Sequence, residues 1–126
     1  MTINIPSLLI KTPLYKGKNG TAAQEIVDAP NSAVIFYYWG FPIIADHASQ
    51  SNMIRLKYCI PHLTKCFVDG ERYVCVKKTK GILKSTTIIV DGESIRDMTT
   101  DLCIYTCTGK KINGEIEVWV TFWKKK

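Results

Sequence analysis

The chain has 126 residues, a length that fits one domain, and its hydrophobic share of 46% is that of a folded globular protein. A disordered chain and a membrane-spanning helix are both excluded, because the longest apolar run, 33–39, is far shorter than the ~20 residues that a spanning helix needs. The net charge is +6, and 14 of the 17 basic residues are lysines. Neither a basic stripe with interleaved aromatic residues nor a known binding motif occurs, so no nucleic-acid partner is predicted.

Short runs of β-branched and aromatic residues predict strands along most of the chain. The predicted strands are 8–10, 34–39, 73–76, 86–90, 102–106 and 116–122. Turn signals separate them, including Asp69-Gly70, Asp91-Gly92 and Asn113-Gly114, and the first of these predicts a hairpin. Helical turns are predicted only within 21–27 and 49–63. This pattern predicts one compact all-β domain, either a closed barrel or a sandwich.

The two ends of the chain carry little information about targeting. The first six residues have no basic region followed by an apolar one, so the sequence as written predicts neither a signal peptide nor an anchor. Lys124, Lys125 and Lys126 form a basic tail after Trp123. A frayed, solvated tail is favoured over contact with an anionic surface.

The five cysteines are an odd number, and none of their spacings forms a CxxC pair. Cys103 and Cys107 are close enough in sequence to hold a metal, but they lie in a strand-like run rather than on a turn. We therefore predict no metal and no other cofactor, and a chain with reduced thiols. Core positions are predicted for Cys59, Cys66, Cys75 and Cys103, because cysteine is a small apolar residue that fills β cores.

Cys107 is the candidate nucleophile. It ends the predicted strand 102–106 and is followed by Thr108-Gly109-Lys110-Lys111. A cysteine at a strand end beside a basic loop is partly exposed in positive surroundings, and these conditions lower a thiol pKa from roughly 8.5. The competing interpretation is that Cys107, like the other cysteines, fills the core.

His47 is the candidate acid and base. It follows the apolar run 42–45, and a histidine at the exit of a strand can exchange protons near neutral pH. The competing interpretation is a histidine that satisfies a loop, which is how His62 is interpreted. His47 and Cys107 are far apart in the sequence and can meet only through the fold.

The order of these features resembles the catalytic domain of the sortases, the cysteine transpeptidases of Gram-positive bacterial surfaces. Ile43-Ile44-Ala45-Asp46-His47 is similar to the family's histidine strand, with Asp46 where glycine is usual, and Cys103-Ile104-Tyr105-Thr106-Cys107 is similar to its T-L-x-T-C signature. The other resembling segments are Ile5-Pro6, a turn at Pro13-Leu14-Tyr15-Lys16-Gly17, the entry 30–34, the apolar Met53 and Leu56, and the strand pair around 69–74.

The resemblance implies a single sortase-like domain over residues 1–126. Its fold would be all-β, a closed β-barrel of about seven or eight strands with one or two short helices. It also implies that the Cys107 thiolate attacks a carbonyl of a peptide or protein substrate bearing a sorting-type motif and forms a thioacyl enzyme, while His47 moves the proton. An amine acceptor or water would then release the product. The substrate groove is expected between a loop at 77–86 and the segment 91–100, and the extracellular cell surface is the expected location if the protein acts as the family does.

One departure from the family concerns an arginine that supports the oxyanion from the strand after the cysteine. Counting from Asn113-Gly114 puts this position at about Glu115, and no arginine follows Arg96. Lys110 or Lys111 from the loop, or Arg55 or Arg96 from elsewhere, would have to supply the cation, and a lysine lacks the planar fork of donors. Two alternatives therefore stay open: a catalytically weak sortase-fold binding or regulatory module, and a non-enzymatic β-barrel interaction domain.

Overall fold

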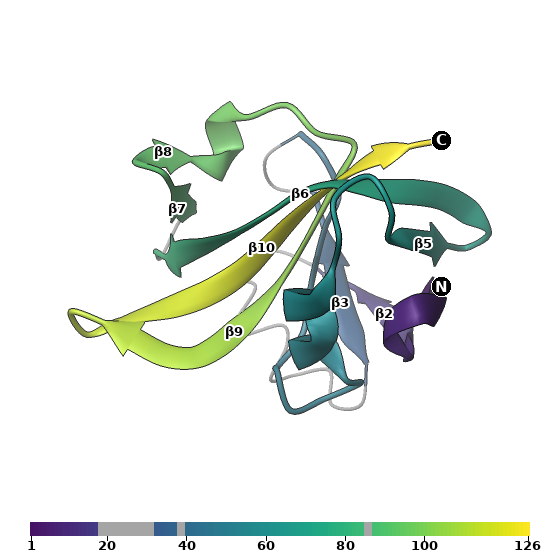
Figure 1. Cartoon of the computed structure of the whole chain (residues 1–126), viewed down its shortest axis with the longest axis horizontal. Helices are drawn as coiled ribbons and strands as arrows, with labels where there is room; N and C mark the ends of the chain where they lie inside the picture. The colour runs from purple at the N-terminus through teal and green to yellow at the C-terminus, as the bar shows by residue number, and fades with distance from the viewer. Residues whose placement is uncertain (18–31, 38–39, 85–86) are drawn as a thin grey trace.

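The computed structural model describes residues 1–17, 32–37, 40–84 and 87–126. These residues form ten strands and three short 3-10 helices (Figure 1). In chain order the elements are β1 (Thr2–Ile5), η1 (Pro6–Leu8), β2 (Ile10–Lys16), β3 (Ala33–Phe36), β4 (Ile43–Ala45), η2 (Met53–Tyr58), β5 (Lys65–Val68), β6 (Glu71–Leu83), β7 (Ile88–Val90), β8 (Glu93–Ser94), η3 (Ile95–Asp97), β9 (Leu102–Ile112) and β10 (Glu115–Lys125). The helix predicted at 21–27 lies outside the described residues. Of the described helices, none has the length and apolar character that crossing a membrane requires.

The strands close into a barrel. Their order is β10-β9-β4-β3-β2-β1-β5-β6, and pairing of β10 with β6 joins the two ends into a ring of eight. Two pairs are parallel, β2 with β3 and β4 with β9, while the other pairs are antiparallel. Strands β7 and β8 extend from β6 outside the ring. The predicted closed all-β barrel is confirmed.

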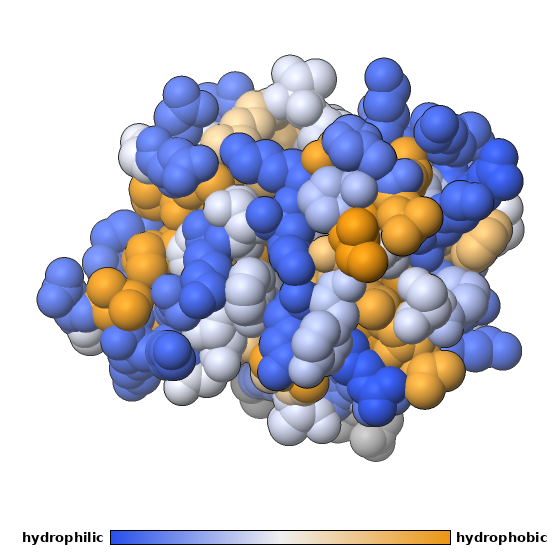
Figure 2. All heavy atoms as spheres, viewed as in Figure 1, coloured by the Kyte–Doolittle hydropathy of each residue, from blue (hydrophilic) through white to orange (hydrophobic). Residues whose placement is uncertain are grey.

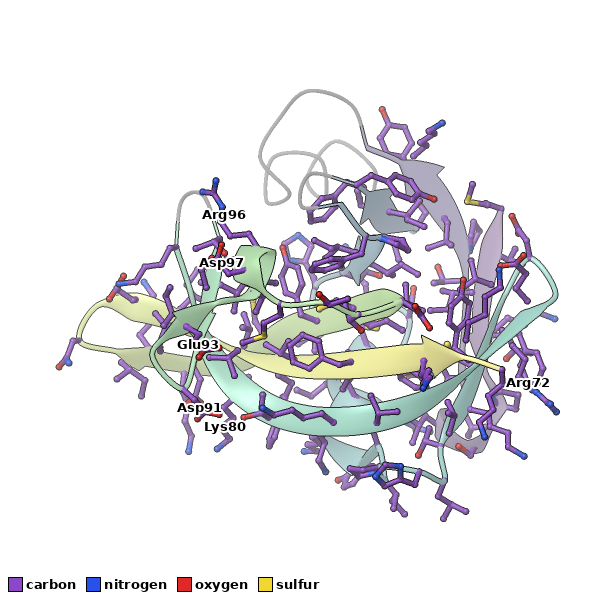
Figure 3. All side chains as sticks on the ribbon, turned by 90° about the horizontal axis from the view of Figure 1, so that it is seen from above. Arg72, Lys80, Asp91, Glu93, Arg96 and Asp97 are labelled. Atoms are coloured by element: carbon purple, nitrogen blue, oxygen red, sulfur yellow. The ribbon has the colours of Figure 1, made fainter. Side chains whose placement is uncertain are left out.

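Two apolar clusters lie on opposite faces of the barrel wall. The barrel interior holds Ile44, Ile104 and Trp123 among others, whereas Ile43, Ala45, Cys103, Tyr105, Val118 and Val120 belong to an outer cluster. The assignment alternates residue by residue along β4 and β9, as the pleat of a strand requires. An outer layer built from β7, β8 and η3 covers the outer cluster through Ile88, Val90 and Ile95. Figure 3 shows this layer, with Asp91, Glu93 and Asp97, beside the turn-side half of the β9–β10 hairpin.

A glycine allows the outer layer to pack closely. Gly81 lies in β6 where β7 crosses it, and a Cβ there would come within 2.8 Å of Ile88 Cγ2 and 2.9 Å of the Ile89 carbonyl oxygen. Both distances are shorter than atoms tolerate without moving, so any larger residue would push β7 away from the barrel.

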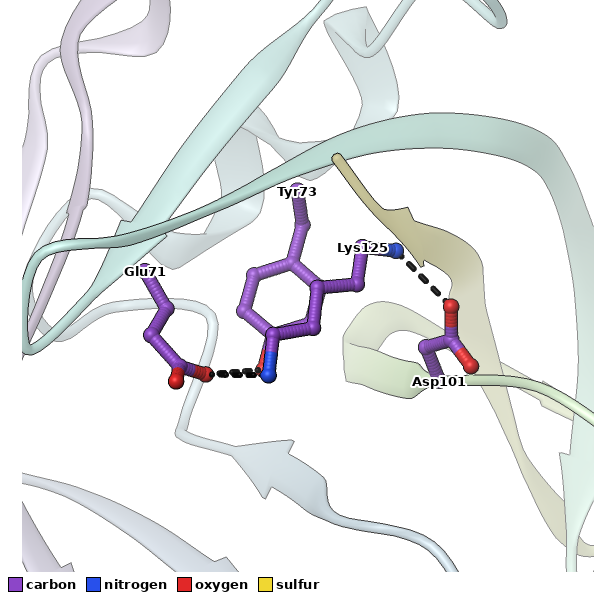
Figure 4. A network of polar contacts seen from close by, with 4 residues as sticks. All are labelled: Glu71, Tyr73, Asp101 and Lys125. Atoms are coloured by element: carbon purple, nitrogen blue, oxygen red, sulfur yellow. Dashed lines mark hydrogen bonds and ion pairs between the residues drawn. The ribbon is translucent and has the colours of Figure 1, made fainter.

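The two longest strands close the barrel, and polar contacts hold their ends. The ladder between β10 and β6 runs from Glu117 opposite Ile82 to Lys125 opposite Tyr73. At that end Lys125 Nζ lies 3.1 Å from Glu71 Oε2, and the Tyr73 hydroxyl donates to the same oxygen at 3.3 Å. The Lys125 backbone N–H donates to Asp101 Oδ2 at 2.8 Å (Figure 4). The Lys126 backbone N–H also donates to the Arg72 carbonyl oxygen at 3.0 Å, so the basic tail is bound to the barrel rather than frayed.

Three sequence predictions about elements are wrong. The strand predicted at 8–10 is interrupted, because η1 ends at Leu8 and Leu9 takes a left-handed φ of 55°. The turn expected at residues 13–17 is mostly strand, since β2 continues to Lys16 and pairs with β3. The loop expected at 77–86 is largely the second half of β6. This part of the strand is rich in lysines, and a run of polar residues is also typical of a loop. The hairpin at Asp69-Gly70 is confirmed.

Candidate active site

The parallel pairing of β4 with β9 aligns the two segments that carry the candidate residues. Ala45 pairs with Tyr105, the last ladder pair of the two strands. The buried Thr106 hydroxyl then donates to the Asp46 carbonyl oxygen at 2.7 Å, so the strands stay aligned one residue further. The next position along each chain segment holds His47 and Cys107. Cys107 follows Cys103 and Tyr105 onto the outer face and packs against the outer cluster, while His47 lies two residues beyond the end of β4.

Cys107 differs from the other cysteines in its exposure. Cys59, Cys66, Cys75 and Cys103 are all buried, which confirms their predicted core positions, whereas Cys107 is half-buried against the outer cluster. All five thiols are free. Reagents in solution can therefore reach Cys107 more readily than the other four.

The predicted electrostatic setting of Cys107 is wrong. Strand β9 does not end at residue 106 but continues to Ile112, so Cys107 lies within a strand rather than at the start of a basic loop. Burial raises the pKa of its thiol instead of lowering it. The reason is geometric: Lys110 lies within an irregular stretch of β9 and Lys111 beyond it, both exposed, while Cys107 packs against the apolar side chains of the outer cluster.

A wide bulge follows Cys107 directly. Val118 of β10 pairs with Cys107 and Ile116 pairs with Lys111, so residues 108–110 all oppose Glu117. Gly109 takes a φ of 92°, which glycine adopts without strain. The Thr108 hydroxyl donates to Glu117 Oε1 at 2.9 Å and accepts the Lys110 backbone N–H at 3.2 Å. Bulges of this kind re-aim neighbouring side chains and are common beside active sites.

The position expected for the family's arginine does not fall at Glu115. Glu115 pairs with Ile112 at the turn end of the hairpin, and its carboxylate forms an ion pair with Lys84. The residues of β10 that face Cys107 and the bulge are Val118 and Glu117. Counting from the turn failed because the bulge makes β9 longer than β10 over this stretch.

The four candidate cations are differently placed. Arg55 Nη1 donates to the Leu8 carbonyl oxygen at 3.4 Å, which turns it toward η1. Arg96 points outward from η3 (Figure 3). Lys110 is the last residue of the bulge, and Lys111 lies on the far side of the bulge from Cys107. Two of the four are thus directed elsewhere, and a lysine would have to reach back across the bulge.

Asp46 lies directly before His47. The sequence indicated only that an acid stands there where the resembling family usually has glycine. Its side chain is 2% exposed, and Oδ1 accepts the His47 backbone N–H at 2.8 Å. Burial raises the pKa of the Asp46 carboxyl, and hydrogen bonds from His47 N–H and the Ser51 hydroxyl oppose that rise. Oδ2 is buried without a hydrogen-bond partner. An acidic residue directly after an apolar strand was the sequence feature that could have indicated a role for Asp46. In the structure its carboxyl group fixes the backbone at His47.

The described residues include no cluster of three or more histidine, cysteine or acidic side chains suited to a metal ion. A cavity of about 270 Å³ lies elsewhere on the barrel, where Tyr37, Glu71 and Tyr73 are among its lining residues. Cys107 and His47 do not line it.

Solved structures of sortases are similar to this chain. Sortase C2 of pilus island 1 from Group B Streptococcus gives a TM-score of 0.64 at 13% identity, covering 99% of this chain and 72% of that one. Sortase A of Listeria monocytogenes gives 0.61 at 12%, covering 99% and 88%. Sortase C of Clostridium perfringens SM101 gives 0.60 at 15%, covering 98% and 68%. No protein-family model and no curated protein matches the sequence. The chain therefore has the sortase fold.

Proposed function

We propose that this protein is a sortase-like cysteine transpeptidase or peptidase. The Cys107 thiolate attacks a backbone carbonyl of a bound peptide, and the C–N bond of the resulting tetrahedral intermediate breaks. His47 gives its proton to the departing amine, which leaves a thioester on Cys107. His47 then takes a proton from an incoming amine or water as that nucleophile attacks the thioester, and the Cys107 thiolate is released. An amine acceptor makes the reaction a transpeptidation, and water makes it a hydrolysis.

The observation that carries the proposal is the register of β4 with β9. Many folds contain a half-buried cysteine, but here His47 and Cys107 each follow the last pair of the parallel ladder, Ala45 with Tyr105, by two residues. The Thr106 bond to the Asp46 carbonyl oxygen extends this alignment. A nucleophile on one strand and a base just after its neighbour support the arrangement that covalent catalysis needs.

A second function is favoured by the surroundings of Cys107. Burial raises the pKa of the thiol, which opposes a thiolate. Glu117, the residue of β10 opposite the bulge, lies on the face away from Cys107, and the structure gives no cation in contact with the thiol among the described residues. These features fit a sortase-fold module that binds a peptide and turns over weakly, with Cys107 and His47 retained. A non-enzymatic barrel whose sequence resembles sortases by chance is disfavoured, because the structural likeness extends over nearly the whole chain.

The two functions are separated by trapping the acyl enzyme. The full chain is incubated with a library of peptide thioesters or activated peptide esters, and intact-mass spectrometry follows acylation. The transpeptidase proposal expects a stable mass increase at Cys107, located by peptide mapping, which disappears when a glycine-based amine is added. His47→Ala should abolish the increase, while His62→Ala, at an exposed loop histidine, should leave it unchanged. Binding without acylation in the parent chain supports the binding module and contradicts the enzyme.

A further inference from the structure

An exposed apolar turn follows η2. Ile60 and Leu63 are 53% and 65% exposed, and they flank a turn closed by the Leu63 N–H bond to the Ile60 carbonyl oxygen at 3.0 Å. Pro61 and the positive φ of His62, 68°, suit the two central positions of a type II turn. Tyr58, just before the turn, is 60% exposed. Three large apolar side chains are thus held out to solvent by one short segment.

Hydrogen bonds attach the turn to the barrel. The Ile60 N–H donates to Thr64 Oγ1 at 2.8 Å, and the His62 N–H donates to the Cys75 carbonyl oxygen of β6 at 2.6 Å. The exposure of Ile60 and Leu63 is therefore a feature of the folded chain. Apolar groups that remain in water on a well-fixed turn usually mark a binding surface.

Lysines surround the turn. Lys57 Nζ lies 5.1 Å from the centre of the Tyr58 ring, and Lys78 Nζ donates to the Lys57 carbonyl oxygen at 2.6 Å. Lys78 and Lys80 both lie over the Trp119 ring, at 5.8 and 4.9 Å from its centre. We call Tyr58, Ile60, Leu63, Lys57, Lys78 and Lys80 the η2 patch. Figure 2 shows apolar side chains gathered near the connection between η2 and β5, with hydrophilic ones around them.

Positive charge predominates around the η2 patch, with Glu117 as an acid beside Trp119 on the same face of β10. The sequence contains no acidic residue at 47–68 or at 72–90, the two segments that build the patch. The acid that precedes Trp119 on the same face of β10, Glu117, accepts the hydrogen bond from Thr108. The patch therefore combines a protruding apolar centre with a cationic rim.

We infer that the η2 patch docks the protein onto an anionic lipid bilayer, with Ile60 and Leu63 inserted among the headgroups. Tyrosine, tryptophan and lysine are the side chains that settle at a membrane interface, because each has an apolar body and a polar or charged tip. Each lysine near an anionic bilayer contributes about 1 kcal/mol, and the inserted aliphatic side chains add apolar burial. A second copy of this chain is a poor occupant, since the two cationic rims would repel.

Docking through this patch leaves the candidate active site open. Trp119 alternates with Val118 and Val120 along β10, and those two residues face the outer cluster that contacts Cys107. Trp119 and the lysines over it thus lie on the face of the sheet opposite to Cys107. A bilayer on one face would leave the other accessible to a peptide, although the docking does not depend on catalysis.

The test is co-sedimentation of the full chain with vesicles of phosphatidylcholine containing about one-third phosphatidylglycerol, and with pure phosphatidylcholine vesicles. The parent should bind the anionic vesicles and lose that binding as salt screens the lysines. Ile60→Ser with Leu63→Ser should lower the partition coefficient by roughly tenfold or more. Lys80→Gln should lower it about fivefold, the equivalent of about 1 kcal/mol.

Matched controls lie at the hairpin turn, where Ile112 is 43% exposed and Lys111 is exposed. Ile112→Ser and Lys111→Gln should bind vesicles like the parent.

Equal loss of vesicle binding in patch and control variants would overturn the inference, because it would show only a general response to charge and apolarity. Absence of vesicle binding would also overturn it. So would a concentration-dependent dimer in sedimentation velocity that Ile60→Ser with Leu63→Ser disperses, since the patch would then join two copies. Lys80→Gln alone decides the matter if the double variant does not fold.

Discussion

The two halves of β9 differ although they form one strand. From Leu102 to Thr106 every side chain is buried, and the strand pairs with β4 on one side and β10 on the other. From Cys107 onward β4 has ended, the bulge follows, and the strand becomes exposed. Cys103 and Cys107 are the same residue type on the same strand and both contact the outer cluster, yet only Cys107 lies at this junction. The exposure of a cysteine on β9 thus depends on where the neighbouring strand stops.

The largest expected effect separates these two cysteines. Cys107→Ala should reduce acylation about 10⁴-fold or more, because no other side chain can form the thioester. Cys103→Ala should instead leave acylation near the parent rate and lower the free energy of unfolding by about 1 kcal/mol, since it removes a buried sulfur. Intact-mass kinetics and urea denaturation measure the two quantities. Acylation of Cys107→Ala would show that the nucleophile lies elsewhere.

A second prediction concerns the carboxylate at the bulge. Glu117→Arg should increase the acylation rate about threefold through long-range charge, because it replaces an anion opposite the bulge with a cation. Its side chain leaves β10 on the face away from Cys107, so no oxyanion donor is added. Glu115→Arg is the matched control and should have little effect on the rate, since Glu115 lies at the turn end beside Lys84. Stopped assays with a peptide thioester would measure both. If Glu115→Arg accelerates the reaction and Glu117→Arg does not, the register argument is wrong.

The reactivity of Cys107 should depend on pH in a specific direction. Burial raises the pKa of this thiol above its ordinary value near 9.0, so the thiolate fraction at pH 7 is small. The rate of iodoacetamide labelling should rise about tenfold per pH unit from pH 7 to 9 without levelling off, because only the thiolate reacts. Timed labelling with peptide mapping follows each cysteine. A plateau below pH 8 would show a thiol that is activated rather than suppressed, and first labelling of another cysteine would contradict the assignment of the nucleophile.

A substitution at Thr106 tests the hydrogen bond between β9 and the residue that follows β4. Thr106→Val removes the hydroxyl that donates to the Asp46 carbonyl oxygen and keeps the shape of the side chain. The free energy of unfolding should fall by about 1–3 kcal/mol, because a buried acceptor loses its partner. Acylation should slow more than in Thr108→Val, a change in the bulge that leaves this bond intact. Unchanged acylation in Thr106→Val would mean that His47 does not need this alignment.

The smallest expected effect is the pH dependence from Asp46. Because burial raises the pKa of this carboxyl, the folded chain holds the proton more tightly than the unfolded chain does. The contribution of Asp46 to the free energy of unfolding is therefore greatest below about pH 3.8, the ordinary pKa of the carboxyl. This contribution decreases as pH rises through the folded pKa. Asp46→Asn keeps an acceptor for the His47 N–H and should remove this decrease. Urea denaturation of both chains at a series of pH values from 3.5 to 7 measures the difference, and parallel curves would contradict it.

Much of the fold follows from local sequence. Alternating apolar residues, the Asp69-Gly70 turn and the Asn113-Gly114 turn predict short strands and hairpins, because strand pleat and turn chemistry depend on near neighbours. The closed barrel and the candidate pair Cys107 and His47 were also reached from residue order and its resemblance to sortases. The sequence likewise indicated the position of Asp46, as an acid where glycine is usual.

Only the tertiary structure decided what surrounds that pair. The parallel register of β4 with β9 joins residues far apart in the chain, and no local pattern encodes such a register. The bulge moved the position opposite Cys107 from Glu115 to Val118, and the outer cluster raised a thiol pKa that the neighbouring lysines had suggested was lowered. The physical reason is the same in each case. Burial and through-space pairing depend on which distant strands arrive beside a residue, whereas sequence patterns report the residues next to it in the chain.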